Sequence, residues 1–118
     1  MEIRRRYRQL KVWQSAMALV TEVYRVTGGF PETEKFGLVT QMRRAAVSLP
    51  SNIAEGAGRG TDKEFSRFLQ IARGSLFELE TQVDIARRLE LIARPEELNE
   101  HFEHLFAMLN NLIQKLKP

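Results

Sequence analysis

The sequence predicts an all-α fold, an antiparallel up-down-up-down four-helix bundle that forms a single domain over residues 1–118. Glycine and proline concentrate at three internal places, and between them apolar residues recur at steps of three or four. No window alternates apolar and polar residues over the length of a strand. Of the 118 residues, 43% are hydrophobic, which is enough for one core without disulfides or metal ions.

The breaks predict helices at about residues 10–27, 34–58, 62–92 and 95–116, after a short basic arm at residues 1–9. In the last two helices the apolar residues step alternately by four and three, which is the heptad pattern of a bundle seam. The seam residues are Phe65, Leu69, Ala72, Leu76, Leu79, Val83 and Ala86, widened by Phe68 and Leu89, then Leu98, Phe102, Leu105, Leu109, Leu112 and Leu116.

Local signals refine these helices. The glycine pair at residues 28–29 predicts a left-handed cap at the end of the first helix, and Thr61 with Glu64 predicts a capping box at the start of the third. Pro50 predicts a kink in the second helix, because its ring removes one amide hydrogen bond and crowds the preceding turn. Gly74, inside the third helix, predicts the close approach of another backbone.

Cysteine is absent, which excludes disulfides, thiolate nucleophiles and cysteine-based metal sites and fits a reducing compartment. The arginines near the beginning are not followed by an apolar run of signal-peptide length, and no segment is apolar enough to cross a bilayer. We therefore expect a cytoplasmic protein that does not associate with membranes.

No constellation of residues predicts catalysis, a cofactor or a bound metal. The only histidines, His101 and His104, have a spacing that would let both reach one metal ion, but a solvated helix face is the favoured interpretation. No serine has a histidine near it in the sequence, and the glycine-rich residues 56–60 lack the Gly-Lys-Ser/Thr ending of a phosphate-binding loop. A metal-dependent enzyme is therefore only the third hypothesis, and we expect no enzymatic activity.

One face of the second helix is polar throughout and contains no lysine. Its residues are Gln41, Arg44, Ser48, Asn52, Glu55 and Arg59. Surfaces that face only water usually carry lysines, so this polar stripe fits a seam against another subunit, where Arg44 or Arg59 would pair with Glu55. A solvated face is an equally weighted alternative. Phe77 lies off the seam of the third helix and is a candidate for the apolar part of a subunit contact.

Charge is unevenly distributed along the chain. Residues 1–60 hold 10 Lys/Arg and 5 Asp/Glu, a net charge of +5, whereas residues 61–118 hold 8 and 10, a net charge of −2. Guanidinium groups neutralise phosphates and Tyr7 offers a ring for base stacking, although that ring could instead pack on the bundle. The residues expected to contact nucleic acid are Arg4, Arg5, Arg6, Arg8, Lys11, Arg43, Arg44 and Arg59.

Several segments resemble one family closely. They are residues 10–14 (LKVWQ), Phe30-Pro31 with Glu34, residues 41–56 (QMRRAAVSLPSNIAEG) and residues 64–82 (EFSRFLQIARGSLFELETQ). They resemble the bacterial four-helix bundle proteins encoded in intervening sequences of 23S ribosomal RNA genes, sometimes labelled S23 ribosomal proteins. The same fold family includes the accessory variability determinant of diversity-generating retroelements, a basic pentameric barrel that binds nucleic acid and a reverse transcriptase. The resemblance therefore implies a homopentamer and favours nucleic-acid binding.

Two functional hypotheses follow. The first is a non-enzymatic, homo-oligomeric protein, pentameric as the resemblance implies, that engages RNA or DNA through a basic surface, together with a protein partner. The second is a scaffold or regulatory module that recognises only protein. Neither hypothesis requires a cofactor.

Overall fold

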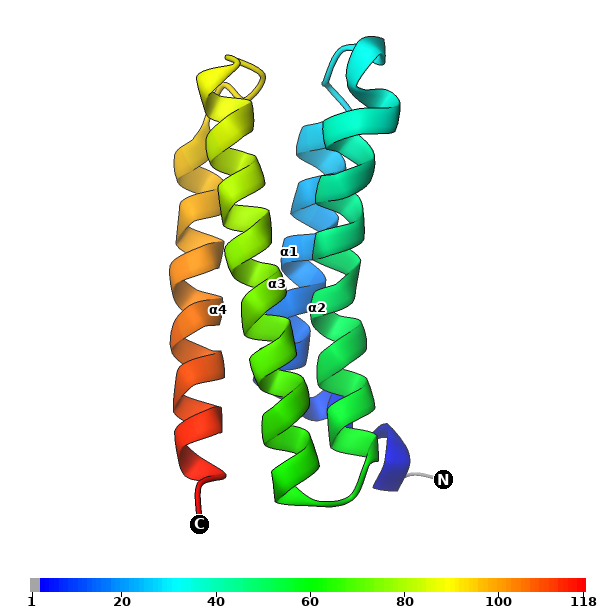
Figure 1. Ribbon diagram of the computed structural model, residues 1–118, viewed down its shortest axis with the longest axis vertical. Helices are drawn as coiled ribbons and strands as arrows, with labels where there is room; N and C mark the ends of the chain where they lie inside the picture. Colours follow the sequence, from blue (N-terminus) through cyan, green and yellow to red (C-terminus); the bar gives the residue numbers. More distant parts are fainter. Residues whose placement is uncertain (1–2) are drawn as a thin grey trace.

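The structure, a computed structural model, describes residues 3–118, with side chains described from Arg6 onward, and it confirms the all-α four-helix bundle. A short 3-10 helix, η1 (Ile3–Gln9), precedes the first long helix. The bundle measures 44 × 26 × 19 Å, and η1, the α2–α3 turn and the end of α4 lie together at one end of it (Figure 1). The four helices, which run alternately up and down, are α1 (Lys11–Thr27), α2 (Thr40–Gly58), α3 (Asp62–Arg88) and α4 (Pro95–Lys115).

The predicted seams of α3 and α4 form the centre of the core. All seam residues of α3 are buried except Phe65, which packs half-buried against the others. In α4 the later seam positions Leu112 and Leu116 are half-buried, and Ile113 is buried instead. A strict heptad drifts around a helix that has 3.6 residues per turn, which explains this shift. The expectation that Leu89 widens the α3 seam is wrong, because α3 ends before it and Leu89 is 56% exposed.

The contact between α2 and α3 is the most extensive in the bundle and depends on Gly56. A Cβ atom at Gly56 would lie 2.5 Å from the Cβ atom of Phe68, so only glycine permits this approach. A Cβ atom at Gly74 would meet nothing within 4 Å. The close approach that the sequence predicted at Gly74 is therefore not made by any described part of this chain, and the packing glycine is Gly56.

The helical dihedrals of the second helical segment are interrupted at Gly37, whereas Pro50 lies inside the continuous helix α2. Gly37 has φ −109° and ψ −107°, which are not helical, and it lies in η3 (Lys35–Val39), a wider helical turn that follows η2 (Glu32–Glu34). Regular α2 begins at Thr40, later than the predicted start near residue 34, and it continues through Pro50 to Gly58. Glycine tolerates such dihedrals because it lacks a Cβ atom.

Two helix ends differ from the predictions. Gly28 keeps right-handed helical dihedrals, φ −60° and ψ −23°, so the left-handed cap expected there is wrong. At the end of α3 it is Glu90 that adopts a positive φ of 60°, while the amide of Leu91 donates to the carbonyl of Ala86 at 2.9 Å. This is the arrangement that usually takes glycine at the position after a helix. Because glutamate takes it here, the sequence placed the helix end too late, near residue 92.

The capping box at the start of α3 is half confirmed. The Thr61 hydroxyl accepts a hydrogen bond from the amide of Glu64 at 3.2 Å. The Glu64 carboxylate does not return to Thr61 but accepts two hydrogen bonds from Arg67, at 2.9 and 3.4 Å. A guanidinium one turn along the helix offers this carboxylate a charged donor, which is stronger than a neutral amide.

Within residues 3–118, no helix combines the length and the apolar character that a membrane span requires.

Replacing Gly56 with alanine tests the α2–α3 contact. We expect Gly56→Ala to lower the free energy of unfolding by about 1–3 kcal/mol, because the added methyl group forces two packed helices apart. The matched control, Gly58→Ala at the end of α2, is expected to be neutral or to stabilise the fold by up to about 1 kcal/mol, since alanine favours a helix and would meet nothing within 4 Å. Urea unfolding followed by circular dichroism measures both, and equal effects at the two positions would contradict the assignment.

Candidate nucleic-acid interface

The antiparallel arrangement gathers basic residues at one end of the bundle. The half that holds η1, the α2–α3 turn and the end of α4 comprises residues 6–19, 50–74 and 106–118 (Figure 1). It carries nine Lys/Arg against three Asp/Glu, a net charge of +6. The other half, residues 20–49 and 75–105, carries seven against eleven, a net charge of −4. We call these halves the basic end and the distal end.

The predicted nucleic-acid contacts divide between these two ends. Those at the basic end are Arg6, Arg8, Lys11 and Arg59, whereas Arg43 and Arg44 lie at the distal end. The side chains of Arg4 and Arg5 lie outside the described residues. The predicted set is therefore not one continuous surface.

The basic end contains five cations that the sequence analysis did not assign to it: Lys63, Arg67, Arg73, Lys115 and Lys117. They belong to residues 61–118, whose net charge is −2, so the charge of each half of the sequence did not reveal them as part of a basic surface. Their position was nonetheless accessible from the helix prediction, because in an up-down bundle the start of the third helix and the end of the fourth meet the beginning of the first.

The segment η1 packs on the bundle through Tyr7. Its ring meets the ring of Trp13 edge-on, with the ring centres 5.4 Å apart and the planes at 71°. The guanidinium of Arg8 lies 5.8 Å from the centre of the Tyr7 ring, and the Gln14 amide donates to the Arg8 carbonyl at 2.9 Å. Tyr7 thus lies against the bundle, as the alternative interpretation expected, and the Arg6 and Arg8 side chains are exposed.

Two arginines cover Phe68 next to the α2–α3 turn. The guanidinium groups of Arg59 and Arg67 lie 5.0 and 4.6 Å from its ring centre. Each also pairs with a carboxylate: Arg59 with Glu55 at 3.1 Å and Arg67 with Glu64 at 2.9 Å. The hydrogen bond from Arg67, and then its positive charge, hold the pKa of Glu64 below its usual value, while Glu64 raises the pKa of Arg67. Both arginines are therefore partly neutralised within the chain.

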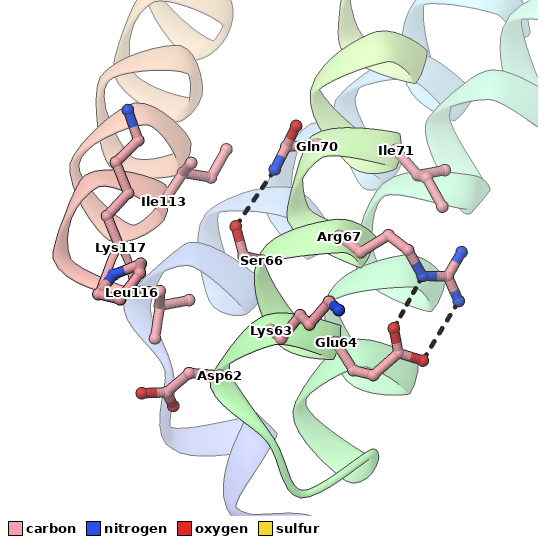
Figure 2. A pocket seen from close by; sticks show the side chains of 11 residues that line it. Asp62, Lys63, Glu64, Ser66, Arg67, Gln70, Ile71, Ile113, Leu116 and Lys117 are labelled. Carbon is pink, nitrogen blue, oxygen red and sulfur yellow. Dashed lines mark hydrogen bonds and ion pairs between the residues drawn. The ribbon is translucent and has the colours of Figure 1, made fainter.

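The lysines of the basic end surround two hollows. Lys63 and Lys117 line a groove of about 900 Å³ between the start of α3 and the end of α4, with Leu116 on its apolar wall (Figure 2). Lys11 and Lys115 line a smaller hollow of about 270 Å³ between α1 and α4. No Lys of these four forms an ion pair with any carboxylate of the described chain.

At the distal end, Arg43 has a structural role. Its Nε donates to the hydroxyl of Thr27 at 2.9 Å, its Nη2 donates to the Tyr24 carbonyl at 3.4 Å, and its guanidinium lies 4.4 Å from the centre of the Tyr24 ring. Thr27 is 2% exposed, so Arg43 satisfies a buried hydroxyl that in turn donates to Val23. Arg44 is exposed and makes no hydrogen bond or ion pair within residues 6–118.

Two side chains of the polar stripe of α2 donate hydrogen bonds to backbone carbonyls of the same helix. The Ser48 hydroxyl donates to the Ala45 carbonyl at 2.6 Å, and the Asn52 amide donates to the Ser48 carbonyl at 2.8 Å. Both residues are half-buried, whereas Gln41, Arg44, Glu55 and Arg59 are exposed. Glu55 pairs with Arg59 of its own chain through one hydrogen bond, whereas the sequence had predicted a pair of Glu55 with Arg44 or Arg59 across a subunit contact. Because Ser48 and Asn52 bond to their own backbone and are half-buried, they project little from α2, and another helix could approach the stripe closely there.

Exposed apolar residues continue this stripe onto α3. Ile71, Gly74 and Ile85 lie at spacings that place them on one side of α3, and the two isoleucines are 41% and 44% exposed. Phe68 and Gln82, about four turns apart, lie on the side of α3 that meets α2. Gln82 is 5% exposed, and its side-chain oxygen accepts no hydrogen bond from the described residues. We call the polar stripe together with these α3 residues the α2–α3 face.

Phe77, the apolar candidate for a subunit contact, lies elsewhere. It is 55% exposed and packs on Phe106 of α4, with ring centres 4.6 Å apart. Arg73, one turn earlier on α3, donates to the side-chain oxygen of Asn110 at 2.8 Å. These residues belong to the α3–α4 seam, so the structure does not bring Phe77 together with the α2 stripe.

The histidines offer no assembled metal centre in the described chain. His101 is half-buried and His104 is exposed, and no group of three or more His, Asp or Glu within residues 3–118 is placed to hold a metal ion. His101 lies close enough to Glu22 to help Arg25, which is the main cause, lower the pKa of that carboxyl.

The fold and the charge distribution define the class of protein, an all-α four-helix bundle whose two ends carry opposite net charge. The family model described as "23S rRNA-intervening sequence protein" matches residues 8–111. The chain therefore belongs to the family of 23S rRNA-intervening sequence proteins, which confirms the resemblance found in its motifs. A comparison with curated proteins found no significant match.

Replacing Arg43 separates its structural role from a binding role. We expect Arg43→Leu to lower the free energy of unfolding by about 1–2 kcal/mol, because it removes a bond to a buried hydroxyl and a cation–π contact. Arg44→Leu, the adjacent exposed residue, is expected to change it by less than about 0.5 kcal/mol. Thermal or urea unfolding measures the difference. Weaker nucleic-acid binding with unchanged stability in Arg43→Leu would instead make Arg43 a contact residue.

Proposed function

We propose that this protein is a cytoplasmic, non-enzymatic binding protein that assembles as a homo-oligomer, a pentamer by family resemblance, and engages nucleic acid through its basic end. One observation carries the proposal: a net charge of +6 at one end of the bundle against −4 at the other. Clustered Lys and Arg release counterions from phosphates, which supplies most of the affinity of sequence-independent binding. Family membership, shown over residues 8–111, is compatible with this function.

The distal end contributes to the same function by repulsion. Its excess of carboxylates disfavours phosphates, so a nucleic acid approaching the bundle is steered toward the basic end. Contact would fall on the exposed cations of the basic end that no carboxylate of the described chain neutralises: Arg6, Arg8, Lys11, Lys63, Lys115 and Lys117.

The proposal of an oligomer is supported by the α2–α3 face. It combines a low polar stripe, the exposed side chains of Ile71 and Ile85, a glycine that no described part of the chain approaches, and the unsatisfied oxygen of Gln82. Buried polar atoms are nearly always hydrogen-bonded, so Gln82 indicates a missing donor at this face. In a closed ring with the bundles parallel to its axis, all basic ends lie on one side and their charges add.

Neutralising two lysines tests the nucleic-acid interface. We expect the double variant Lys63→Ala and Lys117→Ala to bind nucleic acid about tenfold more weakly near 100 mM salt and to reduce the slope of log affinity against log salt by about 2. Fluorescence anisotropy with labelled single- and double-stranded oligonucleotides over a salt series measures both quantities.

The matched control for this test lies at the distal end. Lys35→Ala with Arg94→Ala removes the same charge and is expected to leave affinity and slope nearly unchanged, because both residues lie beside carboxylates far from the basic end. Equal losses in the two double variants would show that only total charge matters, and affinity independent of salt would refute the interface.

Charged substitutions test the assembly. We expect Ile71→Asp together with Ile85→Asp to shift the mass measured by light scattering toward that of one 13.7 kDa chain, since buried unpaired carboxylates oppose association. Met17→Asp, which replaces a similarly exposed residue on α1, is the control and should leave the mass unchanged. An oligomer that survives the double substitution would place the subunit contact elsewhere.

The second candidate function, a protein-only scaffold, is favoured by Phe36. This aromatic side chain is 89% exposed on η3, at the distal end. Large exposed aromatic side chains are typical anchors of protein contacts. Protein partners that survive nuclease treatment in a pull-down and are lost in Phe36→Ala would support the scaffold over the nucleic-acid proposal.

A further inference from the structure

The aromatic rings near the basic end are already engaged with the bundle. Tyr7 packs edge-on against Trp13 and has Arg8 beside its ring, and Trp13 itself packs against the core. Phe68 is 6% exposed beneath Arg59 and Arg67. The rings of the described basic end are therefore buried or half-buried, and none of them is exposed.

Other aromatic residues do not add an exposed ring to the basic end. Phe65 packs half-buried against the core, and Phe106, near the middle of the bundle, packs on Phe77. The first five residues, MEIRR, contain no aromatic residue, so none is hidden there. The most exposed ring, that of Phe36, lies at the distal end among the carboxylates that repel phosphates.

Single-stranded nucleic acids are usually held by stacking their bases on exposed aromatic side chains, which a basic groove then supplements. A duplex hides its base faces and offers a higher density of phosphate charge. The basic end supplies cations without available rings, which is the chemistry that a duplex backbone needs.

We infer that the basic end binds double-stranded nucleic acid through its phosphates, without reading the base sequence and without stacking on single strands. This inference rests on the proposed function and names the form of nucleic acid that the site takes. The wider of the two short dimensions of the bundle is 26 Å, and that length of duplex carries about 15 phosphates on its two strands. The duplex thus offers more than enough phosphates for the exposed cations of this end.

The kind of cation supports sequence-independent contact. Six exposed cations of the basic end form no ion pair within residues 6–118, and four of them are lysines: Lys11, Lys63, Lys115 and Lys117. A lysine is a point charge on a flexible stem, whereas bidentate recognition of guanine in a groove is mainly performed by arginine held in a fixed orientation. Flexible ammonium groups can follow phosphates on any sequence.

The test compares forms of nucleic acid on the intact protein. Fluorescence anisotropy is measured with two RNA duplexes of about 20 base pairs and unrelated sequence, and with an unstructured oligo-uridylate of the same length, each near 50 and 200 mM salt. We expect both duplexes to bind equally, and at least about tenfold more tightly than the single strand, because the single strand has a lower charge density and finds no ring to stack on.

Two variants locate any stacking. Tyr7→Leu at the basic end also loosens η1 with Arg6 and Arg8, so it should lower duplex and single-strand affinities by the same factor, whereas Phe36→Ala at the distal end should change neither. A single strand that binds as tightly as the duplexes, or that loses more affinity than the duplexes in either variant, would overturn the inference while leaving nucleic-acid binding intact. Absence of binding to all three probes and to a DNA duplex of the same length would overturn the proposed function itself, and the inference with it.

Discussion

The close approach of α2 and α3 at Gly56 is the contact on which the rest of the structure depends. Because Gly56 has no Cβ atom, Phe68 packs directly against the α2 backbone. The two helices, whose contact is the most extensive in the bundle, are joined by a turn of only three residues between Gly58 and Asp62. The same contact leaves Phe68 to be covered by Arg59 and Arg67, which brings cations from two helices to the turn. The α2–α3 contact therefore also determines where Arg59 and Arg67 of the basic end lie.

The electrostatic asymmetry is a consequence of antiparallel topology. Along the chain, basic residues are concentrated in the first half, but the bundle reverses direction at each connection and regroups them by end. The start of α1, the turn after α2, the start of α3 and the end of α4 then contribute cations to one end, while carboxylates of α4 and of the α1–α2 connection gather at the other. Under the proposed function, this polarity would orient a bound polyanion toward one end, which would suit an assembly in which several copies point the same way.

The α2–α3 face explains why a helix would retain polar residues that bond mostly to their own backbone. Ser48 and Asn52 satisfy their hydrogen bonds within α2, so a neighbouring helix would approach them without leaving polar atoms unpaired. Gln82 is the exception, since its buried side-chain oxygen accepts no bond from the described residues. Phe77, grouped with this face on sequence grounds, packs on Phe106 instead, because the helical period turns it toward α4.

By itself the sequence determined the all-α class, the helical segments and nearly all of the core, because helical periodicity and breakers are local properties of the chain. Motifs within residues 10–82 also indicated the family, and the family model that matches residues 8–111 shows the membership. Only the tertiary structure decided which glycine is packed, that α3 ends at a left-handed Glu90, that Arg43 serves the buried Thr27 hydroxyl, and that Lys63 and Lys117 stand at the end that also holds Arg8. These features depend on residues brought together from distant parts of the chain, and no local pattern encodes which side chains will meet there.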